Sequence, residues 1–207
     1  YSGIYLINFF KHNSFFLSKN FQALTFSNSI FGYSAHLRVL LFSWLAYEIT
    51  QKDIWVGIVL GVGGSQIFIS SFLGSYLSEK YNINKILFYS YSSFLIILIL
   101  FIFINYEDIY VLLFFSILFG AIPGLSQPAF QTLLINTNDK SNFSKINSYR
   151  YLIIFFGEMV NPIIFAFLIS RFDIDYVIFF AALLLFFSLI LLFFHPADSQ
   201  VKRKKEK

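Results

Sequence analysis

Long apolar blocks, separated by short polar stretches, recur along this chain. There are six of them, at residues 24–47, 54–77, 86–104, 110–134, 151–169 and 177–194. A helix rises about 1.5 Å per residue, so about twenty apolar residues cross the roughly 30 Å hydrocarbon core of a bilayer. A soluble bundle would need polar faces on its outer helices, and these blocks have none. The pattern predicts an all-α polytopic membrane protein with six transmembrane helices.

Composition supports the membrane interpretation and narrows the chemistry. The 207 residues are 57% hydrophobic and only 13% charged, whereas soluble domains are about a quarter charged. The chain has no cysteine, and His12, His36 and His195 lie too far apart in sequence for a metal-ligand spacing. It contains neither a phosphate-binding Gly-rich loop ending in Gly-Lys-Ser/Thr nor a Gly-x-Ser-x-Gly elbow. We therefore expect no enzymatic activity, no cofactor and no bound metal.

Basic residues alternate between the two sides of the predicted bundle. Lys and Arg accumulate in cytoplasmic segments of membrane proteins. With the N-terminus inside, the cytoplasmic segments contain Lys11, Lys19, Lys80, Lys85, Lys140, Lys145, Lys202, Arg203, Lys204, Lys205 and Lys207. The outside loops contain only Lys52 and Arg171. We predict a multi-pass protein of the plasma (inner) membrane with both termini cytoplasmic. The net charge of +4 then reflects topology, and no nucleic-acid partner is expected.

The two ends of the chain differ from the bundle. Residues 1–19 are predicted to form a cytoplasmic or interfacial segment, because the apolar stretch from Tyr1 to Phe16 is too short and too interrupted to span a bilayer. Residues 20–195 form the predicted six-helix bundle. Residues 196–207 end in a basic stretch and are predicted to be a cytoplasmic tail, or a linker to a second half.

The second block carries small residues at a spacing of four. They form two sets, Gly57, Gly61 and Ser65, then Ser70, Gly74 and Ser78. Small residues four apart let a neighbouring helix approach closely. We expect a helix-packing face here, and a helix that also slides or rocks on this face is compatible with the same pattern.

The fourth block combines helix-weakening residues with polar ones. Each proline removes a backbone hydrogen bond and clashes with the carbonyl one turn back. Interrupted backbone at membrane depth is tolerated where it faces protein or a watery cavity. The residues concerned are Gly120, Pro123, Gly124 and Pro128, with Ser126, Gln127 and Gln131 among and after them. The pattern favours a kinked, cavity-lining helix over a purely structural kink.

Ionisable residues also lie inside the blocks. They are His36 and Arg38 in the first block and Glu158 in the fifth, with Arg150 near the inner end of the fifth. A charge at mid-bilayer costs about 2.5–3.5 kcal/mol even on the lenient insertion scale, so such residues usually face the bundle interior and have a partner. Asn161 and Pro162 follow Glu158 by one turn. We hypothesise that Arg38 and Glu158 pair, or that both line one polar cavity; ion pairing without a substrate role is the alternative.

Three stretches carry a family resemblance. Residues 20–24 read NFQAL and are followed by Arg38 and by WLAYEIT at 44–50. Residues 128–134 read PAFQTLL, and residues 74–85, between the second and third blocks, read GSYLSEKYNINK. Together these stretches resemble the N-terminal half of the major facilitator superfamily, specifically its enterobactin-exporter-like branch.

The resemblance implies one six-helix bundle made of two inverted three-helix repeats, which is half of a fold that works by alternating access. It also implies a cytoplasmic gating loop, to which Glu79, Lys80 and Lys85 correspond, whereas Ile83 and Asn84 stand where basic residues are usual. One half cannot enclose a pathway alone. Besides the lipid bilayer, the expected partner is therefore a missing C-terminal six-helix half or a second half-transporter chain.

The functional hypothesis that follows is secondary active, ion-coupled export of a small amphipathic solute, drug or siderophore, as by an efflux antiporter. The residues expected to line the cavity are Asn28, Arg38, Gln127, Gln131, Glu158 and Asn161. Glu158, the only deeply placed acid, is expected to carry the coupled proton. The residues expected to pack or kink the helices are Gly57, Gly61, Gly74, Gly120, Pro123, Gly124, Pro128 and Pro162. The alternative is a non-transporting membrane scaffold or degenerate half-transporter.

Overall fold

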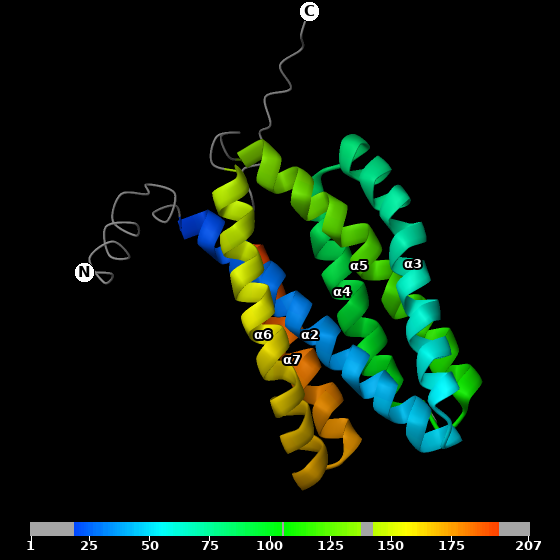
Figure 1. The fold of residues 1–207 in the computed structure, drawn as a ribbon. Coiled ribbons are helices and arrows are strands. Elements are labelled where there is room, and N and C mark those ends of the chain that lie inside the picture. The colour runs from blue at the N-terminus through cyan, green and yellow to red at the C-terminus, as the bar shows by residue number, and fades with distance from the viewer. Residues whose placement is uncertain (1–18, 105, 138–142, 195–207) are drawn as a thin grey trace, which may run out of the picture.

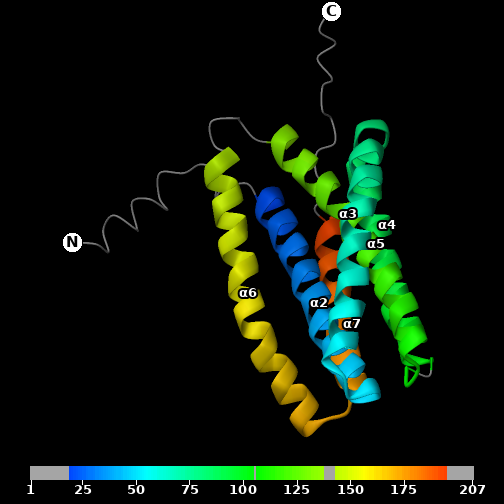
Figure 2. The ribbon, with the colours of Figure 1, turned by 45° about the vertical axis from the view of Figure 1, so that its right-hand side comes forward.

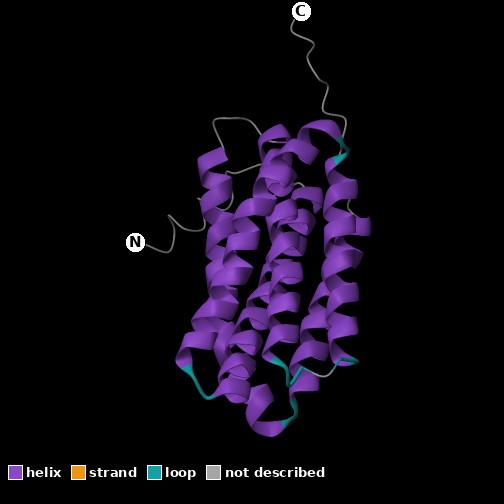
Figure 3. Ribbon diagram, turned by 90° about the vertical axis from the view of Figure 1, so that its right-hand side faces the viewer, coloured by secondary structure: helices purple, strands orange, loops and turns teal. Residues whose placement is uncertain are grey.

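Helices are the only regular structure in the part of the chain that the computed structural model describes, residues 19–104, 106–137 and 143–194. They are α2 (Lys19–Thr50), α3 (Asp53–Lys80), α4 (Ile83–Ile102), α5 (Ile109–Thr137), α6 (Phe143–Arg171) and α7 (Ile174–Phe194). The helices form one elongated bundle in which consecutive helices run in opposite directions (Figure 1). From the side, the described turns lie at the ends of the bundle (Figure 3). The predicted all-α fold class is confirmed. The predicted segments at 1–19 and 196–207 lie outside the described residues, except for Lys19, which begins α2.

Two tight turns mark the opposite ends of the bundle. At one end, α3 passes into α4 through Tyr81 and Asn82, and the Asn82 side chain caps α4 by accepting a hydrogen bond from the Asn84 N–H at 2.9 Å. At the other end, α2 passes into α3 through Gln51, whose φ of 53° is left-handed. The Gln51 N–H donates to the Tyr47 carbonyl at 2.7 Å and closes the last turn of α2. These are called the Tyr81 end and the Gln51 end below.

The first described helix, α2, is the central and most polar one. The other five, α3 to α7, are long and apolar enough to cross a membrane. With 32 residues, α2 is the longest helix, but its buried face carries Ser27, Asn28, Ser29, Ser34 and Arg38. It lies between α6 and α3 (Figure 2). A membrane helix can carry polar groups where other helices surround it, so its polarity reflects its place inside the bundle.

Helices α3 and α5 pack backbone against backbone. A methyl group placed on Gly74 of α3 would lie 2.7 Å from the carbonyl oxygens of Gly124 and Leu125 on α5. Pro128 has no N–H to donate to the Gly124 carbonyl one turn back, and a Gly74 hydrogen faces that oxygen instead. The predicted helix-weakening and small residues therefore fit one another: the carbonyl that a proline leaves free on α5 meets a glycine on α3.

Only part of the predicted small-residue face is used in this contact. The small residues of α3 that are buried are Gly63, Ser70, Gly74 and Ser78. In contrast, a methyl group on Gly57 or Gly61 would have nothing within 4 Å. The two sets are thirteen residues apart, which turns them by about 140° around a helix of 3.6 residues per turn. The second set therefore packs on α5, whereas the first set lies on a different, exposed face of α3, and its packing role stays a prediction.

The outer helices α7 and α4 are held by different chemistry. On α7, the Ser188 hydroxyl donates to the Ser27 carbonyl of α2 at 2.7 Å, and the Ser27 hydroxyl donates to the Ser188 carbonyl at 2.8 Å. On α4, Phe94 packs on Phe119 of α5 with ring centroids 4.9 Å apart. The first contact is a pair of reciprocal hydrogen bonds, and the second is part of an aromatic core.

Candidate functional site

Arg150, on α6, lies at the centre of a polar network inside the bundle. Its Nε donates to Oδ1 of Asn28 on α2 at 3.1 Å, and its Nη2 donates to Oε1 of Gln127 on α5 at 2.9 Å. Only 2% of Arg150 is exposed. Its Nη1 has no hydrogen-bond partner in the described part of the chain. Three helices thus converge on one guanidinium group that still has donors to offer.

The network extends from Asn28 to a fourth helix. The Asn28 Nδ2 donates to the hydroxyl of Tyr91 on α4 at 3.0 Å. The Tyr91 ring is buried and stacks on Phe31 of α2, with centroids 4.2 Å apart. Asn28 therefore uses its carbonyl toward Arg150 and its amide N–H toward Tyr91, and this fixes the orientation of the amide.

Aromatic rings complete the surroundings of Arg150. Its Cζ lies 5.1 Å from the centroid of Phe130 and 5.3 Å from that of Tyr151, within the range of a cation–π interaction. A guanidinium keeps its proton in proteins. Within the described ranges, Arg150 donates to amide oxygens and lies over ring faces, and it forms no ion pair with a carboxylate. The network is therefore a positive charge held by amide dipoles and ring faces.

Gln127 lies between the two prolines of α5. Pro123 and Pro128 both lie inside the helix, and Gln127 directly precedes the second proline. Each proline removes one backbone hydrogen bond, so α5 has its weakest internal bonding where it presents Gln127. Gln131, one turn further along, is half-buried on the same side of the helix.

A second buried guanidinium, that of Arg38, lies apart from the first. Arg38 is 4% exposed, and its Cζ lies 5.6 Å from the ring of Phe42 and 5.7 Å from that of Phe119. It faces α3 and α5, whereas Glu158 lies on α6. The hypothesised Arg38–Glu158 ion pair is therefore wrong for this structure. The reason is geometric: His36 and Arg38 are about 200° apart around α2, and His36 is the one that faces α6.

A second polar contact joins α2 to α6. The Asn161 Nδ2 donates to the backbone carbonyl of Tyr33 at 3.0 Å and lies 3.3 Å from Nδ1 of His36. The Tyr33 ring fills the space beside Gly157, where any side chain would collide with it. Glu158 is half-buried next to this contact, within electrostatic range of the Tyr33 hydroxyl.

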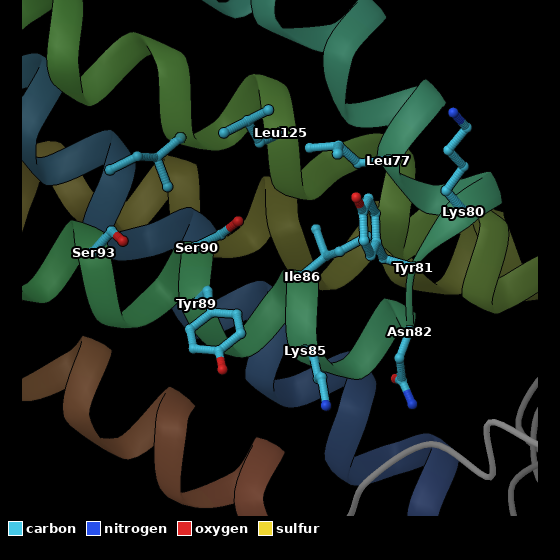
Figure 4. Close-up of a pocket in the computed structure, with 11 residues that line it drawn as sticks. Leu77, Lys80, Tyr81, Asn82, Lys85, Ile86, Tyr89, Ser90, Ser93 and Leu125 are labelled. Carbon is cyan, nitrogen blue, oxygen red and sulfur yellow. The ribbon is translucent and has the colours of Figure 1, made fainter.

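The predicted gating residues lie at the Tyr81 end. Lys80 and Lys85 border a cavity of about 500 Å³ between α3, α4 and α5, and their amino groups point away from it (Figure 4). The Lys80 amino group is held by Tyr76, through its hydroxyl and through its ring, whose centroid is 4.3 Å away. Glu79 is exposed at the same end. These positions are compatible with gating against a further half of the protein, which stays a prediction.

The structure brings together only some of the predicted cavity residues. Asn28 and Gln127 meet through Arg150, which the sequence pattern placed near the end of a block but not in the cavity. Tyr91 was not predicted at all, because a tyrosine in an apolar block carries no sign of an interior role. Glu158 and Asn161 lie in the second α2–α6 contact, and Arg38 lies in neither.

Six helices of membrane length around a buried polar network define half of a membrane transport fold. The model of the Major Facilitator Superfamily matches residues 16–207. The chain therefore belongs to this superfamily, whose members are membrane transporters and not enzymes.

Solved structures with the same fold agree with this assignment. Two are crystal structures of a mutant of the peptide transporter POT, one in complex with alafosfalin and one with sulfate. Both match with a TM-score of 0.71 and 17% sequence identity over 84% of this chain. The match covers 38% and 37% of the two transporter chains, so this chain spans well under half of their length. No curated protein sequence matches it.

Proposed function

We propose that this chain is one half of a secondary active transporter that exports a small amphipathic solute, such as a drug or siderophore, in exchange for an ion. The observation that carries the proposal is the buried network of Arg150, Asn28 and Gln127 at the convergence of α2, α5 and α6. Polar and charged groups inside a membrane bundle are costly and mark substrate or ion pathways. The resemblance to the enterobactin-exporter-like branch supports export as the direction.

Exposed faces support assembly with a second half. Helices α3 and α6 flank the bundle and carry large exposed side chains, among them Phe68 and Phe72 on α3 and Phe156 and Met159 on α6. These faces contact lipid or other helices. We propose that a C-terminal six-helix half, or a second copy of the chain, covers part of them and closes the pathway.

Charge placement supports the proposed orientation in the plasma (inner) membrane. Lys80 and Lys85 lie at the Tyr81 end, and Asp173 and Asp175 lie at the Gln51 end. Basic residues accumulate on the cytoplasmic side, so the Tyr81 end is the cytoplasmic one in this proposal.

Glu158 is the proposed coupling residue. It is the one acid that the described helices carry far from their ends. It is half-buried beside the Asn161–Tyr33–His36 contact between α2 and α6. A carboxylate that gains or loses a proton there changes the charge next to a contact between two helices, which is a direct way to couple a proton to helix movement.

Transport is tested with the chain reconstituted in liposomes that contain self-quenched carboxyfluorescein, under an imposed pH gradient. We expect gradient-dependent release with the wild type, loss of release with Glu158→Gln, and unchanged release with the matched control Asp173→Asn, which alters an exposed acid. Native mass spectrometry of the same sample gives the assembly state, which we expect to include a second copy where release occurs. A monomer without release of any probe would favour the scaffold alternative.

A further inference from the structure

The proposed function uses the polar network of Arg150 but does not say what balances the positive charge of this side chain. A desolvated ion in a protein interior is stable only when a partner neutralises it or forms strong hydrogen bonds with it. Arg150 is 2% exposed, and its neighbours within the described residues are neutral: the amides of Asn28 and Gln127 and the rings of Phe130 and Tyr151. Its charge is therefore uncompensated by these neighbours.

The geometry of the donors indicates what compensates the charge. A guanidinium presents five N–H donors in a planar fork that matches a carboxylate or phosphate with two parallel hydrogen bonds. In Arg150, Nε and Nη2 are directed to Asn28 and Gln127, and Nη1 is without a partner in the described part of the chain. One arm of the fork is thus available to an acceptor, while the other donors hold the group in place.

Arg38 provides a contrast within the same bundle. Its guanidinium also lies between two rings, those of Phe42 and Phe119, and its buried Nε has no hydrogen-bond partner in the described part of the chain. It is therefore not part of a polar network that could select a ligand. Arg150, in contrast, is joined to three other helices through Asn28, Gln127 and Tyr91.

We propose that Arg150 binds the anionic group of the transported solute, so that the substrate class is an amphipathic organic anion with a carboxylate, sulfonate or phosphate group. The Nη1 and Nη2 donors bind the anionic group, with Gln127 exchanging its place on Nη2 for the ligand oxygen. Phe130 and Tyr151 contact the apolar part of the solute. Asn28, fixed by Tyr91, keeps Nε in position throughout.

Entry of the anion requires movement of α5, and the two prolines inside this helix make it easier to bend. Gln127 is the α5 residue that covers Arg150, and it directly precedes Pro128 in a stretch that also contains Pro123. Missing backbone hydrogen bonds lower the cost of bending there. Displacement of Gln127 thus opens the guanidinium without disturbing the bonds between α6 and α2.

The probe for this inference is benzoate, with benzamide as its neutral isostere and benzylamine as its cationic one. Binding of radiolabelled benzoate to the full chain in nanodiscs is measured for the wild type, Arg150→Gln, Arg150→Lys and Arg171→Gln. The last is the matched control, because Arg171 is exposed at the far end of the same helix. Loss of a charge-assisted hydrogen-bonded pair corresponds to about 10- to 100-fold weaker binding.

We expect the wild type and Arg171→Gln to bind benzoate equally, Arg150→Gln to bind it at least about tenfold more weakly, and Arg150→Lys to lie between them. We also expect benzamide and benzylamine to compete poorly. Equal binding of benzoate and benzamide by the wild type would overturn the inference, as would undiminished binding by Arg150→Gln or no binding of benzoate. If Arg150→Gln does not fold, the binding of benzoate, benzamide and benzylamine to the wild type still tests whether the site prefers an anion.

This inference rests on the proposed function, because it names the substrate class of the proposed transporter, but the two fail separately. Binding needs no gradient and no second half. Charge-selective benzoate binding without any solute movement would leave the anion site standing and remove the transport proposal. Gradient-driven release with no preference for anions would support transport and remove the anion site.

Discussion

Two helix pairs, each joining one of the first three helices (α2 to α4) to one of the last three (α5 to α7), are built differently. In one pair, α3 lies on α5 with glycine against backbone, as at Gly74 and Gly124. In the other, α6 lies on α2 through long polar side chains, as at Arg150 and Asn28. The first contact leaves no room for adjustment, and the second depends on groups that can exchange partners. We propose from this comparison that the α3–α5 contact stabilises the fold and that the α2–α6 contact serves the proposed function.

The largest expected effect is on the glycine contact. Gly74→Leu places a side chain where the Gly124 and Leu125 carbonyls already stand, so we expect a loss of about 1–3 kcal/mol or more in the free energy of unfolding. Gly61→Leu is the matched control, because nothing lies within 4 Å of an added methyl there, and we expect a change within about 0.5 kcal/mol. The free energy of unfolding in mixed micelles by denaturant titration measures both. Equal destabilisation would show that the exposed set also packs within this bundle.

A double-mutant cycle sharpens the polar side of the comparison. Asn28→Ala and Arg150→Gln remove the two ends of one hydrogen bond, so their effects on the free energy of unfolding should couple by about 0.5–3 kcal/mol. Asn28→Ala with Arg171→Gln should add within about 0.5 kcal/mol, since those residues share no contact. Additivity in the first cycle would mean that the bond between α2 and α6 contributes nothing.

A smaller effect is expected at the second α2–α6 contact. Asn161→Ala removes the donor to the Tyr33 carbonyl, with an expected loss of about 0.5–1.5 kcal/mol in the free energy of unfolding. We also expect amide exchange to become faster around residue 33, where the contact is lost, and to stay unchanged around residue 74 on α3. Hydrogen exchange followed by mass spectrometry measures this difference. Faster exchange on α3 as well would contradict the independence of the two helix pairs.

The smallest expected effect lies at the Gln51 end, where the turn between α4 and α5 lies near the start of α7. Burial raises the pKa of Tyr106, and the carboxylates of Asp175, Asp173 and Glu107 raise it further. A raised pKa favours the neutral phenol in the folded state, so this stabilisation is present below the ordinary tyrosine pKa of about 10 and is lost as the pH rises through the higher folded value. The absorbance difference between wild type and Tyr106→Phe gives the titration midpoint. Asp175→Asn should lower the titration midpoint of Tyr106. An unchanged midpoint would show that the Asp175 carboxylate does not lie near Tyr106.

The sequence was a good guide to the helices of the bundle, because the length of an apolar block follows directly from the thickness of the bilayer. It was a poorer guide to the faces of the helices. The spacing of four marked both Gly61 and Gly74 as packing residues, but it did not show that the helix turns their two sets to different sides. The opposite charges of Arg38 and Glu158 led to the hypothesis of an ion pair, although the two residues lie on different sides of α2. Rotation around a helix accumulates over several turns, so short spacings do not predict which distant residues share a face.

The same reasoning explains what was found and missed in the candidate site. Asn28 and Gln127 could be predicted because polar residues deep in apolar blocks are costly there. Arg150 appeared to lie at the edge of a block, because the apolar pattern begins at residue 151, whereas α6 begins at Phe143 and carries Arg150 well inside the helix. Its importance comes from three helices converging on it, and convergence is a property of the fold.

The most direct test of the comparison is a pair of distance measurements by pulsed electron paramagnetic resonance. The chain has no cysteine, so spin labels can be placed at the exposed positions Phe26 and Leu152 across α2–α6, and Ile58 and Phe114 across α3–α5. We expect a broad α2–α6 distribution that narrows with benzoate, and a narrow α3–α5 distribution that benzoate leaves unchanged. An α3–α5 distribution as broad as the other, or one that shifts with benzoate while α2–α6 stays fixed, would contradict the account.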